Sequence, residues 1–167
     1  MRDKLPYIAA VTALLALGTS WLVNGLRVDN YGAYNAELMP LVTLQSTLIE
    51  AFGAANLETV ATEVDAWAKE AHRIDRMVEG ITPSDAELQP LHAAIQARSK
   101  SLAQALDALA RAMVASDETV RAQEMRDFES RAAAASRSMD TFITLKRAYV
   151  SRHGLPEEGR PPNEALP

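Results

Sequence analysis

The histidines and acidic residues are the side chains of this sequence that are chemically suited to hold a metal ion or move a proton. A di-iron site in a helical bundle needs a glutamate three residues before a histidine on facing helices. No glutamate stands three positions before His72, His92 or His153. His72 and Asp75 share a helix face, but two ligands are too few for a metal site. We therefore predict no metal site, and we interpret His153, at a helix end, as a residue that compensates the helix dipole.

Catalytic patterns are equally sparse. The chain has no cysteine, and its seven glycines are scattered, which gives neither a Gly-x-Ser-x-Gly nucleophile turn nor a phosphate-binding loop. Glu63 and Asp65 are two residues apart and therefore point to different faces of a helix. The sequence predicts no catalytic residue and no cofactor, and an enzyme or metal-binding bundle is the weakest of three functional hypotheses.

The overall charge argues against a nucleic-acid-binding protein. Lysine and arginine number 17 against 22 aspartates and glutamates, which gives a net charge of −5. Proteins that bind nucleic acids usually carry a basic stripe. Apolar residues make up 48% of the chain, so wholesale disorder is also excluded.

The N-terminal segment predicts a membrane anchor. Residues Leu5 to Leu26 carry no charge, and about 20 apolar residues suffice to cross a bilayer as a helix. Arg2 and Lys4 precede this run, so a short N-terminus is expected to remain in the cytoplasm. We therefore predict that residues 1–30 form a single-pass anchor in a bacterial inner membrane, with the remainder of the chain in the periplasm.

Two alternatives to a retained anchor remain open. The run Ala16-Leu17-Gly18 resembles the cleavage site of a signal peptide, although the apolar character resumes with Trp21. A cleaved signal would also export the remaining chain. The other alternative is a buried helix of a soluble protein.

The residues after the anchor predict an all-α fold, an antiparallel bundle of three to four helices over residues 31–154. Asn56 is a suitable N-cap for a helix. We expect this helix to end at Gly80, in the left-handed conformation that glycine adopts easily. Ser84 and Glu87 have capping-box spacing before the next helix. The helix that begins after Asn56 has apolar residues at alternating spacings of three and four, a pattern typical of helices that pack lengthwise on partners. They form its apolar seam, which consists of Leu57, Val60, Val64, Trp67, Ala71, Ile74, Val78 and Ile81.

Two more helices follow. One follows the Ser84 capping box, has seam residues from Leu88 to Met113, and is expected to kink or restart at Pro90 in its first turn. In this helix Arg98 replaces an apolar seam residue, so we expect its stem to lie on apolar surface and its head to reach water. The last helix begins at Ser116 or Asp117 and ends before Gly154. We expect a single core that contains Trp67, Ile74, Leu106 and Phe142.

The segment between the anchor and the bundle is ambiguous. Asp29-Asn30-Tyr31-Gly32 is typical of a turn, after which Leu38, Leu41, Leu44, Leu48 and Phe52 suggest a helix. Alternatively, the segment continues the membrane helix with a kink. Residues 155–167 are proline-rich and predict an extended tail.

Aromatic and basic residues near the two ends of the bundle are the candidate partner contacts. Amphipathic rings favour membrane boundaries, and Trp21, Tyr31 and Tyr34 cluster where the anchor should leave the membrane. Arg147 and Arg152 lie near the C-terminal tail and could hold an acidic partner. Besides the lipid bilayer, we expect a membrane-protein partner or a second copy of the chain.

These features lead to two functional hypotheses. The first is a non-catalytic accessory subunit that packs against another component of a membrane assembly. The second is a periplasmic sensor, because residues 31–153 resemble the four-helix-bundle periplasmic domains of bacterial chemoreceptors and kinases in the number and order of their helices. Those proteins have a second membrane helix that leads to an output domain, whereas this sequence is expected to end in a polar tail and to signal through a partner.

Overall fold

The computed structural model describes the backbone of residues 5–155 and the side chains of residues 29–155. Within this part the chain is all-α and contains no strand, which confirms the predicted class. The helices are α1 (Leu5–Ala54), α2 (Leu57–Glu79), the short 3-10 helix η2 (Ala86–Leu88), α3 (Gln89–Val114) and α4 (Glu118–His153).

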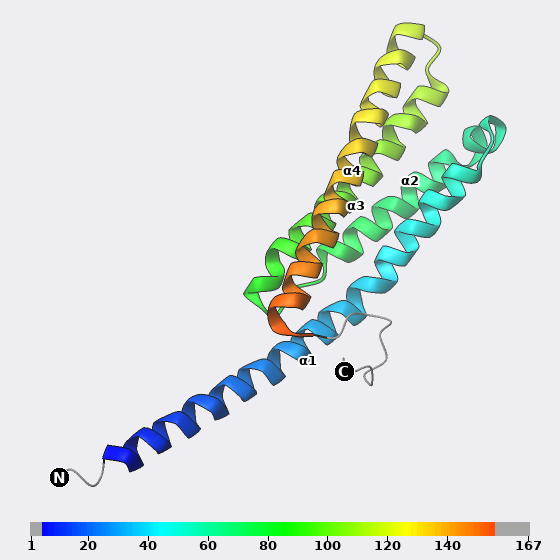
Figure 1. Ribbon diagram of the computed structural model, residues 1–167. Coiled ribbons are helices and arrows are strands. Elements are labelled where there is room, and N and C mark those ends of the chain that lie inside the picture. Colours follow the sequence, from blue (N-terminus) through cyan, green and yellow to red (C-terminus); the bar gives the residue numbers. More distant parts are fainter. Residues whose placement is uncertain (1–4, 156–167) are drawn as a thin grey trace, which may run out of the picture.

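The helices form two hairpins whose directions alternate (Figure 1). Helices α1 and α2 make the first hairpin, α3 and α4 make the second, and α2 packs against α3 to join them. The turns at residues 55–56 and 115–117 lie at the same end of the bundle, which we call the distal end. The connection through η2 lies at the opposite, proximal end, where α1 enters the bundle.

Helix α1 is one continuous helix, so the turn predicted at residues 29–32 is wrong and the alternative, continuation of the first helix, is correct. Continuation places Tyr31, Tyr34, Leu38 and Leu41 on one buried face, and their packing outweighs the local turn preference. Pro40 lies inside this helix, at an exposed position.

The segment Leu5 to Leu26, where the sequence predicts the anchor, precedes the residues with described side chains. Within the described part, no helix combines the length and apolarity needed to cross a bilayer. Trp21 and residues 156–167 of the predicted tail also lie outside the described side chains.

The predicted start of α2 is confirmed, whereas the prediction for its end is wrong in one respect. The Asn56 side chain accepts a hydrogen bond of 2.9 Å from the Thr59 backbone N–H. Gly80 ends the helix, but with a φ of −73° it is right-handed, not left-handed. Its N–H bonds to the Arg76 and Val78 carbonyls, so the last turn tightens without a left-handed residue.

The predicted capping box of Ser84 and Glu87 is replaced by a different cap. Asp85 accepts a hydrogen bond of 2.8 Å from the Glu87 backbone N–H and starts η2. The Glu87 carboxylate instead accepts from His153, at 2.9 Å. This tertiary contact therefore also corrects the interpretation of His153 as a residue that only compensates the helix dipole.

The boundaries of α3 and α4 agree with the sequence predictions. Pro90 stands in the first turn of α3, where its missing N–H costs nothing. Asp117 caps α4 with hydrogen bonds to the backbone N–H groups of Thr119 and Val120. Gly154 ends α4 in the left-handed region, with a φ of 60°.

The core is divided into two clusters instead of the single core that the sequence predicts. Ile74 and Phe142 belong to the larger, proximal cluster, and Leu106 belongs to the second cluster. All three are buried as predicted. Trp67 is only half-buried, beside the second cluster, and Leu57 at the start of the α2 seam is 76% exposed. The α2 seam therefore loses its packing partners towards the distal end.

Candidate functional site

An apolar cavity of about 330 Å³ lies between α1, α3 and α4. Its size falls at the lower end of the range of small-molecule pockets, roughly 300–1,000 Å³. Carbon atoms make up most of its wall, and a few polar side chains gather near one end. The lining residues are Leu48, Ile49 and Phe52 from α1, Arg98, Leu102, Ala105 and Leu106 from α3, and Phe128, Ala132, Ala135, Ser136, Met139 and Asp140 from α4.

Arg98 is the cation in the cavity wall. Its side chain is only 7% exposed, so only a small part of it reaches water, less than the sequence pattern suggests. Burial lowers the pKa of the Arg98 guanidinium, which nevertheless stays charged because an arginine pKa begins above 12. The guanidinium is held inside by a hydrogen bond of 2.8 Å from Nε to the Oε1 atom of Gln45.

Gln45 connects Arg98 to a second polar residue. It is completely buried in α1, and its Nε2 donates a hydrogen bond of 2.5 Å to Ser99 Oγ. Ser99 Oγ in turn donates to the Ile95 carbonyl, at 3.0 Å. No sequence motif marks Gln45. Its position on the buried face of α1, between Leu41 and Leu48, is the signal that could have identified it.

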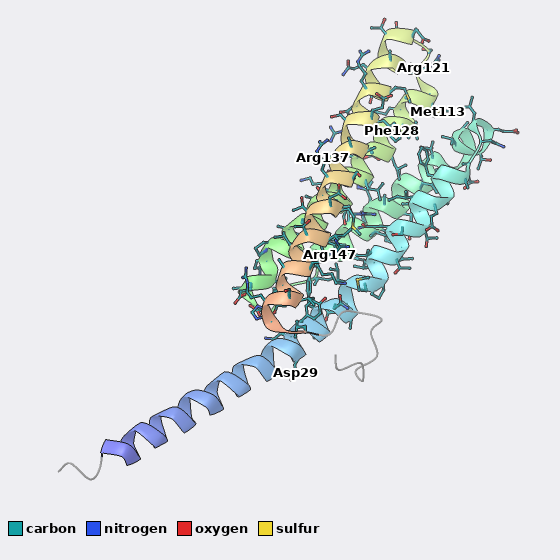
Figure 2. The ribbon with its side chains drawn as sticks, in the orientation of Figure 1. Asp29, Met113, Arg121, Phe128, Arg137 and Arg147 are labelled. Atoms are coloured by element: carbon teal, nitrogen blue, oxygen red, sulfur yellow. The ribbon has the colours of Figure 1, made fainter. Side chains whose placement is uncertain are left out.

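The two ends of the cavity differ in chemistry. From the order of residues along α1, α3 and α4, Arg98, Ser136 and Asp140 lie nearer the proximal end of the cavity than Phe52 and Phe128 do. These two rings touch edge to face, with centroids 5.8 Å apart. Figure 2 labels Phe128 on α4, above the level of Arg137. The cavity is therefore polar at one end and aromatic at the other.

A second cleft, of about 270 Å³, lies between the tips of the two hairpins. Its walls are Leu57 from the first hairpin and Ala112, Met113, Arg121 and Met125 from the second. Figure 2 labels Met113 and Arg121 close to the turn between α3 and α4. Val114 and Val120, on either side of that turn, are 82% and 51% exposed. The distal end thus presents apolar side chains to its surroundings.

Tyr31 and Tyr34, two of the predicted partner contacts, lie inside the proximal core. The Tyr31 ring stacks on Tyr149 with centroids 5.5 Å apart, and the Tyr34 hydroxyl lies 3.3 Å from Nδ1 of His92. Both rings are buried because the continuous α1 turns them towards α3 and α4, and their role in partner contact stays a prediction. Burial raises the pKa of Tyr34, whose hydroxyl therefore stays protonated.

The two predicted basic contacts lie on the outside of α4. Arg147 is exposed, and Figure 2 labels it on the proximal half of the helix. Arg152 is also exposed and lies 3.5 Å from the Glu87 carboxylate. The structure does not bring these two arginines together with the cavity, so any role in partner binding is separate from it.

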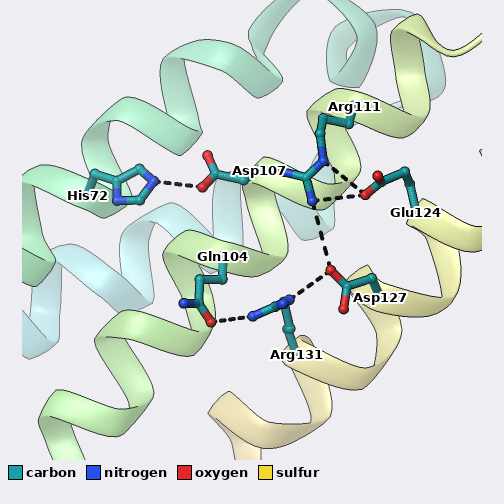
Figure 3. Close-up of polar contacts among 7 residues, drawn as sticks. All are labelled: His72, Gln104, Asp107, Arg111, Glu124, Asp127 and Arg131. Atoms are coloured by element: carbon teal, nitrogen blue, oxygen red, sulfur yellow. Dashed lines mark hydrogen bonds and ion pairs between the residues drawn. The ribbon is translucent and has the colours of Figure 1, made fainter.

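A row of charged residues joins α2, α3 and α4 on the distal half of the bundle (Figure 3). His72 Nε2 lies 2.8 Å from Asp107, and Arg111 bonds to Glu124 at 2.9 Å. His72 thus finds its partner on α3, and not in Asp75 on its own helix. Most of these side chains are between one third and one half exposed, so their pairs contribute roughly 0–1 kcal/mol each. The row continues through Asp127, Arg131 and Gln104.

No group of three or more histidine, cysteine, aspartate or glutamate side chains in the described residues is arranged to hold a metal ion. Comparison with known protein families, with curated proteins and with solved structures finds no match.

Proposed function

We propose that the protein is a non-catalytic accessory subunit, anchored in a bacterial inner membrane by residues 1–30, whose helical bundle binds another membrane component in the periplasm. The anchor is supported by the uncharged run from Leu5 to Leu26 and by Arg2 and Lys4 before it. The continuity of α1 through Ala54 supports a direct connection between anchor and bundle. A continuous helix would hold the bundle at a fixed distance and angle from the membrane.

The proposal of a protein partner is supported mainly by the apolar side chains that are exposed at the distal end. Leu57 and Val114 are 76% and 82% exposed, and each lies at a tip of one hairpin. Apolar surface favours burial against a partner by roughly 25 cal/mol per Å². Met113 and Met125 line the cleft between the tips, and flexible methionines adapt well to partner surfaces.

Arg147 and Arg152, at the proximal end, and the proline-rich residues that follow Gly154 in the sequence form a second candidate contact. Arg147 makes no hydrogen bond or ion pair with the described residues, so its charge is available to an acidic partner. On this account the accessory subunit would contact its partner at both ends of the bundle.

The test is purification of the full chain from membranes in mild detergent, followed by mass spectrometry of the proteins that co-purify. We expect a stoichiometric membrane protein that is lost from the variants Leu57→Asp and Val114→Asp. Met77→Asp is the matched control, because Met77 is also exposed, at 43%, but lies on α2 away from the distal end. Equal recovery of the partner with all three variants would contradict a role for the distal end.

The sensor hypothesis is the second candidate, and the cavity beside Arg98 is the observation that favours it. A chain that binds a small ligand inside its bundle would communicate through the same partner. Recovery of the chain without any stoichiometric partner would argue against both forms of the proposal.

A further inference from the structure

We propose that the cavity between α1, α3 and α4 binds a small amphiphile with an anionic head, of the class of a medium-chain fatty acid, with its carboxylate on Arg98. The site is distinct from the distal end and from the proximal arginines to which partner binding is assigned above. It does not depend on the location of the bundle in the cell.

The head group is inferred from the unused donors of Arg98. The guanidinium has five N–H donors, and Gln45 accepts only the one on Nε. No aspartate or glutamate of the described residues lies within 4 Å of Arg98 as an ion-pair partner. A buried charge without a counter-charge is costly, and a carboxylate matches the two-pronged geometry of a guanidinium. The cavity therefore offers an anion a position that the protein does not fill itself.

The hydrogen bonds behind Arg98 keep the guanidinium in place. Gln45 and Ser99 are both buried, and their bonds fix Arg98 from the side away from the cavity. Because the guanidinium is already ordered, an anion would gain its hydrogen bonds without ordering a free arginine side chain.

Asp140 also lines the polar end of the cavity, but it does not neutralise Arg98. Its side chain is exposed, and it forms no ion pair with a described cation. An exposed carboxylate is well hydrated, so its repulsion of a bound anion is weak compared with the attraction of a buried cation.

The apolar body of the ligand is inferred from the rest of the wall. Ala105 lies seven positions after Arg98 on α3, which corresponds to about 10 Å along the helix. Over that length the wall consists of leucine, alanine and methionine side chains and ends at the rings of Phe52 and Phe128. Ala132 and Ala135 leave the space open, because larger side chains at these positions would fill it. An unbranched alkyl chain of medium length fits such a volume.

The experiment uses the full chain in amphipol and a decanoate probe with a diazirine at the end of its alkyl chain. Irradiation and mass spectrometry should place the adducts on the peptides that contain Phe52 and Phe128. Unlabelled decanoate should displace the probe at concentrations at least tenfold lower than decanol, which has the same chain without the charge. Adducts elsewhere, or equal displacement by the acid and the alcohol, would overturn the proposal.

Variants separate the head-group contact from the cavity itself. Arg98→Met should weaken displacement by decanoate roughly tenfold or more and leave displacement by decanol unchanged, since one charged contact is lost. Ala132→Trp should abolish labelling by filling the cavity. Ala133→Trp is the matched control, because Ala133 is exposed and does not line the cavity. Undiminished labelling of Ala132→Trp would overturn the proposal even if Arg98→Met fails to fold.

Discussion

The Nε atom of Arg98 on α3 donates a hydrogen bond of 2.8 Å to Oε1 of Gln45 on α1. This contact joins the first and second hairpins through the interior of the bundle. Since both side chains are at least nine-tenths buried, the bond is protected from competing water. The same bond links α1, the helix that contains the proposed anchor, to Arg98 in the wall of the cavity.

The first prediction concerns this pair. Gln45→Leu should lower the free energy of unfolding by about 1–3 kcal/mol, because Arg98 Nε and Ser99 Oγ each lose a buried partner. The double variant Gln45→Leu/Arg98→Met should lose less than the sum of its two single variants, because it removes both ends of the bond. Chemical unfolding of the native protein, the two single variants and the double variant measures the interaction energy between the two side chains. Additive losses would show that the two side chains do not interact.

The second prediction compares two aromatic residues. Phe142 is 3% exposed, so Phe142→Ala should lower the free energy of unfolding by about 3–5 kcal/mol through loss of contacts and formation of a cavity. Trp67 is half-buried and touches Phe52 edge to face, with centroids 5.9 Å apart. Trp67→Ala should therefore cost clearly less, about 1–3 kcal/mol. Thermal melting of both variants shows which one loses more stability. A larger loss of stability for Trp67→Ala than for Phe142→Ala would contradict the described core.

The third prediction concerns His92 and acid. Burial lowers the pKa of the His92 imidazole below its ordinary 6.5. The unfolded chain therefore binds a proton that the folded chain excludes, and the folded state should lose stability as the pH falls below about 6.5. Above that pH both states carry a neutral ring and this dependence should vanish.

Unfolding titrations between neutral and mildly acidic pH test this dependence. His92→Phe should flatten the acid limb of the stability curve, because the group that takes up the proton is gone. The Tyr34 hydroxyl loses its partner in this variant, so we expect lower stability at every pH together with a flatter curve. An unchanged acid slope in His92→Phe would assign the dependence to other groups.

Three helix ends were predictable from the sequence. Asn56 and Asp117 start helices because a side chain reaches a backbone N–H only two or three residues away. Gly154 ends α4 because a left-handed residue at that position favours glycine. The contacts that start or end these helices involve residues only a few positions apart, so a short stretch of sequence is enough to predict them.

The candidate site was not predictable, because it depends on contacts between distant segments. The buried Arg98 donates a hydrogen bond to Gln45, which lies 53 residues earlier in the sequence. A seam arginine with an exposed head has the same sequence pattern. Tyr31 and Tyr34 posed a similar problem, because amphipathic rings suit both a membrane boundary and a core whose polar groups are paired. Tertiary packing decides between these outcomes.

The central claim, an anchored bundle on the periplasmic side, can be tested directly because the native chain has no cysteine. Arg137→Cys places a single thiol at an exposed site of α4 to which no partner contact is assigned, and Asp3→Cys places one before the proposed anchor. Full-length variants would be treated in intact spheroplasts with a maleimide that does not cross membranes. We expect Arg137→Cys to be labelled at once and Asp3→Cys only after lysis, with both proteins in the carbonate-washed membrane pellet. Labelling of Arg137→Cys only after lysis, or recovery of the chain in the soluble fraction, would contradict the claim.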